Sequence, residues 1–129
     1  THDIASARYV SDRIHVMYGG RIIESGPTEQ IVSDPVHPYT RLLIDAAPDP
    51  AHYKGSGHSA ALTTSNAPPV DNSVEVVGCR FANRCPLARP ECTSAPIPRY
   101  RGPDGRDVLC VLADERPDFT PTHAAPAAR

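Results

Sequence analysis

The chain has 129 residues, a formal net charge of −2, and a composition of 40% hydrophobic and 22% charged residues. Fifteen prolines, two phenylalanines and no tryptophan exclude one large core along the whole length, because large apolar side chains are too few to fill it. No apolar run approaches the ~20 residues that cross a bilayer, and no signal peptide is visible, so the cytosol is the default compartment. We expect two ordered parts joined by a loose segment.

The first forty residues predict a short helix followed by a hairpin. Ile4, Ala7 and Val10 stand three positions apart, a spacing typical of a helix packed on one face. In "RIHVMYGGRIIESG", two β-prone runs flank Gly19-Gly20, which supply the positive φ angles of a tight turn.

Two helices are predicted next, each punctuated by proline. "TEQIVSD" follows Gly26-Pro27, and Pro35 ends it. Pro38 then opens a helix in which apolar residues recur at the spacing of one buried face, namely Tyr39, Leu42, Leu43 and Ala46.

The rest of the chain predicts little regular structure. Residues 49–73 are mostly small and polar, as in a flexible linker. "SVEVVG" is expected to form a brief strand leading into Cys79, and residues 114–129 are expected to form a disordered tail.

Cys79, Cys85, Cys92 and Cys110 stand out in a segment rich in arginine. Two disulfides, a zinc site and a 4Fe–4S cluster each use four cysteines, but a cytosolic setting argues against disulfides. The gaps between the cysteines are wider than the C-x₂₋₄-C pairs usual for structural zinc, while iron–sulfur clusters tolerate irregular spacing.

The charge of the cysteine segment favours an anionic site without separating iron from zinc. Residues 79–107 carry six arginines against three acidic residues, which would offset the charge of four thiolates around a metal. Arg80 and Arg84 are expected to lower the pKa of neighbouring thiols. Without interleaved aromatic residues or lysines, the same patch is a weak nucleic-acid signal, and we expect no nucleic-acid partner.

Taken together, "THD", "SDRIHVMYGGRIIESG", "HPYT" and "GCRFANRCPLARPEC" resemble the end of the ATP-binding subunit of ABC transporters, in the branch that imports oligopeptides, dipeptides and nickel. The resemblance covers roughly residues 1–113. It implies an α/β fragment from the end of the nucleotide-binding domain at residues 1–48. A small, loop-rich, cysteine-ligated lobe would follow at residues 74–113.

The resemblance also implies roles for the first residues. His2 matches the switch histidine, which contacts the γ-phosphate of ATP and holds the attacking water. Asp3 would lie in the neighbouring loop that communicates across the ATPase dimer. No G-x-x-x-x-G-K-[ST] phosphate loop occurs here, so the chain alone is expected neither to bind ATP well nor to hydrolyse it. His15 and His37 match no catalytic position and are expected to be structural or solvent-facing.

Cofactors and partners follow from the same resemblance. The parent subunit would use ATP with Mg²⁺, and some importers of this branch carry a 4Fe–4S cluster at the matching cysteines, with zinc as the alternative here. The metal would hold together a lobe that lacks apolar mass. The partners would be a second ATPase subunit, the membrane permease subunits and, indirectly, an extracytoplasmic solute-binding protein, at the cytoplasmic face of the membrane.

A second hypothesis is a free-standing four-cysteine metal module with a redox or interaction role. Such a module has no need of Thr1-His2-Asp3 joined to a hairpin and an amphipathic helix. A phosphate loop encoded upstream would favour the transporter hypothesis. An independent hydrolase using His2 is disfavoured, because no nucleophile or base is placed near it in the sequence.

Overall fold

The computed structural model describes residues 4–46, 73 and 75–122. His2 and Asp3 lie outside the described residues, as do nearly all of the expected linker and the end of the expected tail. The described part is a small α/β fold built on an antiparallel sheet.

The predicted hairpin and helices of the first part all form. Helix α1 spans Ile4–Val10, the hairpin strands β1 and β2 span Arg13–Tyr18 and Arg21–Pro27, and helices α2 and α3 span Thr28–Ser33 and Pro38–Ala46. Gly19 and Gly20 have φ angles of 57° and 79°, the left-handed backbone that the two-residue turn requires. Local sequence therefore specifies this part of the fold.

The second part consists of short elements. They are η3 (Ala82–Arg84), α4 (Glu91–Ser94), β3 (Tyr100–Arg101), η4 (Pro103–Gly105), β4 (Asp107–Val108), η5 (Val111–Glu115) and β5 (Thr120–Pro121). The expected strand in "SVEVVG" is wrong for its described residues, because 75–78 adopt no strand. Gly78 has a φ of 87°, which breaks an extended run just before Cys79.

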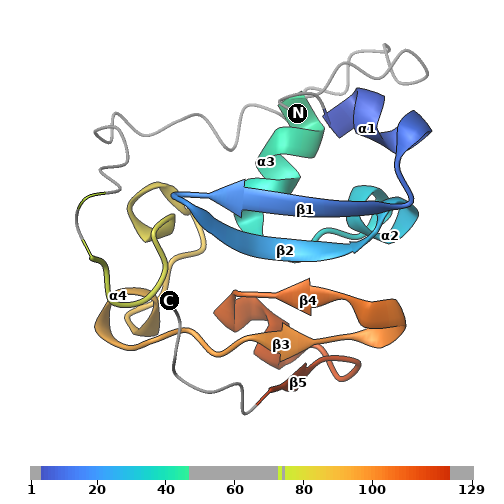
Figure 1. The fold of residues 1–129 in the computed structure, drawn as a ribbon. Coiled ribbons are helices and arrows are strands. Elements are labelled where there is room, and N and C mark those ends of the chain that lie inside the picture. The colour runs from blue at the N-terminus through green and yellow to red at the C-terminus, as the bar shows by residue number, and fades with distance from the viewer. Residues whose placement is uncertain (1–3, 47–72, 74, 123–129) are drawn as a thin grey trace.

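One sheet joins the two parts, in the strand order β1-β2-β4-β3-β5. Glu24 and Ser25 of β2 pair with Val108 and Asp107 of β4, and the Leu109 amide donates to the Ile23 carbonyl oxygen at 2.8 Å. Figure 1 shows the hairpin lying alongside β4 and β3, with the cysteine-bearing segment near the end where β1 turns into β2. The two expected parts therefore share backbone hydrogen bonds rather than forming separate bodies.

Residues 114–122 differ from the disordered tail that was expected there. The end of η5 and all of β5 lie within this stretch, and the Phe119 ring is only 5% exposed. It packs in a cluster with Val36, Tyr100 and Val108, and the guanidinium carbons of Arg106 and Arg116 each lie 5.2 Å from its centre. A single aromatic residue thus binds a polar, proline-containing segment to the core.

A second apolar cluster lies beneath the first helices. It is formed by Ala7, Ile14, Val16, Ile23 and Ile31. The cluster around Phe119 contains Val36, from the segment before α3, together with residues of the second part. The connection between α2 and α3 therefore runs from the apolar cluster of the first part to the cluster around Phe119.

Candidate functional site

The four cysteines line one pocket. They come from the loop before η3, the ends of η3 and η5, and helix α4, and His37, Phe81 and Leu112 line the same pocket. Cys92 and Cys110 are buried, Cys79 and Cys85 are half-buried, and all four are free thiols. Residues as far apart in sequence as 37 and 110 therefore meet at one apolar cavity.

The donor set of this pocket fits a thiolate-bound metal, because four sulfur atoms are what both tetrahedral zinc and a 4Fe–4S cluster require. Within the described residues, however, no group of three or more His, Cys, Asp or Glu side chains stands in a metal-binding arrangement. The pocket thus gathers the cysteines without closing them around one point. Their role as ligands stays a prediction.

Tight backbone turns place the cysteines. The Cys79 amide donates to the Cys92 carbonyl oxygen at 2.7 Å, and the Cys85 amide donates to the Ala82 carbonyl oxygen at 3.3 Å. The Arg89 amide donates to the Cys92 sulfur at 3.4 Å. Gly78 makes the first contact possible, because a Cβ at this position would lie 2.2 Å from the Cys92 carbonyl oxygen.

Burial dominates the electrostatics of the thiols. Together with a smaller contribution from the nearby cysteines, it raises the pKa of Cys110 to about 12. Burial also raises the pKa of Cys79 and of Cys85. At these three cysteines burial therefore outweighs any lowering of the thiol pKa by Arg80 and Arg84. A positive group among the sulfurs would favour the thiolate form at these three positions.

His37 also lines the pocket, although the sequence pattern predicts no chemical role for it. Its side chain is 1% exposed, its Nδ1 accepts the Tyr39 amide at 3.0 Å, and its Nε2 lies 3.8 Å from the Cys79 sulfur. Burial lowers the pKa of His37 to about 4, so the ring is neutral at pH 7. The histidine before Pro38 gave no signal of this contact, since Cys79 lies 42 positions away.

A buried carboxylate holds the segment that presents His37. Glu24 of β2 is 0% exposed, and its two oxygens accept the Val36 amide at 2.8 Å and the His37 amide at 3.0 Å. Arg106, 3% exposed, donates to Glu24 at 3.4 Å and to the Asp34 carbonyl oxygen at 2.6 Å. Strand β2 thus fixes the backbone at His37 through one side chain.

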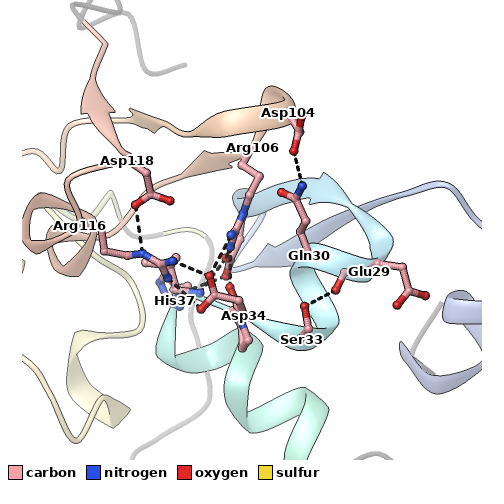
Figure 2. A network of polar contacts seen from close by, with 12 residues as sticks. Glu29, Gln30, Ser33, Asp34, His37, Asp104, Arg106, Arg116 and Asp118 are labelled. Atoms are coloured by element: carbon pink, nitrogen blue, oxygen red, sulfur yellow. Dashed lines mark hydrogen bonds and ion pairs between the residues drawn. The ribbon is translucent and has the colours of Figure 1, made fainter.

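Asp34 extends this network towards the C-terminal end (Figure 2). Its carboxylate accepts Arg116 at 3.0 Å and Arg106 at 3.3 Å, and these partners lie 82 and 72 positions away. The hydrogen bond from Arg116 holds the pKa of Asp34 below its usual value, with a smaller contribution from Arg106. Two arginines of the second part therefore bind the connection between α2 and α3 through Asp34.

Other predicted residues do not join this site. His15 lies exposed on β1. The switch-histidine role of His2 and the role of Asp3 stay predictions, because both residues lie outside the described part of the chain. Among the described residues, the helices are too short or too polar to cross a bilayer.

The sequence matches a known family and is similar to ATP-binding proteins of peptide transporters. Residues 23–92 match the family described as "Oligopeptide/dipeptide transporter, C-terminal region". The oligopeptide transport ATP-binding protein OppF of Escherichia coli is 35% identical over 113 residues, covering 88% of this chain and 33% of that protein. The di/tripeptide transport ATP-binding protein DppF of Pseudomonas aeruginosa is 37% identical over 119 residues, covering 89% of this chain and 34% of that protein. The chain thus spans about a third of the length of these relatives.

The first prediction concerns the buried ion pair between Glu24 and Arg106. Replacing Glu24 by glutamine leaves the buried Arg106 guanidinium without the Glu24 carboxylate. Replacing Arg106 by methionine leaves the buried Glu24 carboxylate without that guanidinium. Each change is expected to lower the free energy of unfolding by about 3 kcal/mol. The double variant should lose clearly less than the two losses added together, because it buries no uncompensated charge from this pair.

Denaturant unfolding of the four proteins measures this coupling. Glu29→Gln is the matched control, since its 3.7 Å contact with Arg8 is exposed and an exposed pair contributes about 0–1 kcal/mol. Strictly additive losses for Glu24 and Arg106 would contradict the network described above.

Gly78 makes a second prediction, with Gly20 as its control. Both have positive φ, but a Cβ at Gly20 meets nothing within 4 Å, whereas one at Gly78 collides with the backbone at Cys92. Gly20→Ala is expected to cost about 1 kcal/mol, the strain of a left-handed alanine. Gly78→Ala should cost about 1–3 kcal/mol more, the usual penalty of overpacking, and should increase alkylation of Cys92 by iodoacetamide. Equal losses of stability for the two variants would refute the close approach.

Proposed function

Since the chain belongs to the C-terminal-region family of oligopeptide/dipeptide transporters, we propose that it is the closing part of an ATP-binding subunit that powers import of peptides or related solutes. The observation that carries this proposal is the family match over residues 23–92, from β2 through α3 to the first three cysteines. The hairpin and helices supply the end of the nucleotide-binding domain. The phosphate loop and Mg²⁺ ligands would come from the part of the subunit that the relatives have beyond this region.

In this proposal His2 acts at the γ-phosphate. A histidine can donate one hydrogen bond and accept another, so it can contact a phosphate oxygen and a water at the same time. Asp3 lies in the loop that faces a second ATPase subunit. The other partners are the permease subunits, at the cytoplasmic face of the membrane, and indirectly an extracytoplasmic solute-binding protein.

We further propose that Cys79, Cys85, Cys92 and Cys110 hold a 4Fe–4S cluster, with zinc as the second candidate. Their convergence on one pocket supports this. When bound, the metal supplies a positive centre that would tie the segments bearing the four cysteines together. The protein's own residues position the sulfurs through turns and exclude water with an apolar wall. The family match favours this arrangement over a free-standing metal module.

A chimera tests the transport proposal. This chain replaces the matching C-terminal third of the Escherichia coli oligopeptide transport subunit, and peptide uptake is measured in cells lacking that subunit. The chimera should restore uptake, and His2→Ala in the chimera should reduce it at least about 100-fold, since general acid–base groups contribute 10²–10⁴-fold. His15→Ala, an exposed change on β1, should leave uptake intact. A chimera that assembles with the permeases but imports nothing would sink the proposal.

Anaerobic reconstitution tests the metal proposal. The chain is incubated with iron and sulfide, or with zinc, and its metal content, visible absorption and melting temperature are measured. Bound iron and sulfide in equal amounts with broad visible absorption are expected. A folded, colourless zinc protein would replace iron by zinc, and a chain that binds neither would refute the centre. Each Cys→Ser variant should lose metal and melt at a lower temperature, as should the parent chain treated with a chelator.

A further inference from the structure

The orientation of the His37 ring is fixed by a backbone donor. The Tyr39 amide lies 3.0 Å from Nδ1, and a backbone N–H can only donate, so Nδ1 must carry a lone pair. An imidazole always retains at least one ring proton, and that proton therefore lies on Nε2. The tautomer is thus assigned from the hydrogen-bond network, independently of any titration.

The same ring is held by its own backbone and by its surroundings. The His37 amide donates to Glu24 at 3.0 Å, and Pro38 opens α3 immediately after it. The Phe81 ring centre lies 5.8 Å from that of His37. With 1% of the residue exposed, water cannot compete for Nε2. The group in reach of Nε2 is the Cys79 sulfur at 3.8 Å.

We propose that His37 is a positioning residue that donates its Nε2–H to the Cys79 sulfur and stays outside the coordination shell of the metal. This inference rests on the proposed four-cysteine centre and names a further residue of that same site. A sulfur ligand in an apolar pocket carries charge that is best stabilised by N–H donors, and such donors tune both affinity and reduction potential. The Arg89 amide plays the equivalent part for Cys92, at 3.4 Å.

Glu24 then has a role beyond stability, because it holds the backbone of the residue that contacts Cys79. Glu24 belongs to β2 and holds the backbone at His37, while the His37 ring reaches the loop that bears Cys79. A continuous chain of polar contacts therefore runs from the hairpin of the ATPase part to one metal ligand.

Cadmium-113 NMR of the whole chain tests this inference. Cd²⁺ alone is added as the probe, because its chemical shift distinguishes four sulfur ligands from three sulfurs and one nitrogen. We expect four sulfur ligands and a slowly exchanging His37 Hε2 proton with scalar coupling to ¹¹³Cd through the Cys79 sulfur. His37→Leu should remove the coupling and weaken Cd²⁺ binding about 10–100-fold.

Two variants separate the hydrogen bond from packing. His37→Gln keeps a side-chain N–H donor near the position of Nε2 and should restore most of the affinity lost in His37→Leu. His15→Leu removes an exposed histidine from β1 and should change nothing. Affinity lost equally in His37→Leu and His37→Gln, with no coupling in the parent chain, would reduce His37 to a packing residue and overturn the inference.

The outcomes distinguish failure of this inference from failure of the proposed centre. Four sulfur ligands without coupling, or a shift showing a nitrogen ligand lost in His37→Leu, overturn the role of His37 and leave the centre standing. Absence of Cd²⁺ binding refutes the centre instead. The ¹⁵N shifts of His37 in the metal-free chain then decide the contact, where a proton on Nδ1 contradicts it and a proton on Nε2 supports it.

Discussion

The buried contact between Glu24 and Arg106 ties the first part of the described structure to the second. It lies where β2 of the first part meets β4 of the second, and both side chains are almost fully removed from water. Burying a carboxylate is costly unless its oxygens are occupied, and here two amides and a guanidinium occupy them. The connection between α2 and α3 can take its path because this carboxylate satisfies its amides.

The cysteine pocket depends on that connection. His37 reaches Cys79 only because the segment before α3 is held against β2, and Phe81 packs between the His37, Tyr18 and Tyr39 rings at 5.2–5.8 Å. These rings form the apolar wall between the hairpin and the cysteine loops. Apart from Phe81 and Phe119, the described residues of the second part contain one aromatic side chain, Tyr100, so much of the cohesion of this part comes from this wall, from the Phe119 cluster and from arginine contacts. A metal at the cysteines would add the cross-links that a larger core provides elsewhere.

Local patterns predicted the first part well. The hairpin followed from Gly19-Gly20 between β-prone runs, and helix α3 from Pro38 and the apolar spacing behind it, because these signals act within a few residues. Predictions failed where a distant contact decided the outcome. The strand before Cys79 does not form, since Gly78 turns the backbone into contact with Cys92. Residues 114–122 look like a tail in sequence, yet Phe119 finds its cluster in the fold.

Residue types at short or characteristic spacing were enough to predict the family, the local elements of the first part and the set of cysteines that act together in the proposal. Tertiary structure alone decided that the two parts share one sheet and that Asp34 meets arginines 72 and 82 positions away. It also decided that His37 faces Cys79. Burial and charge pairing between distant segments arise only when the chain is folded, and no periodicity records them.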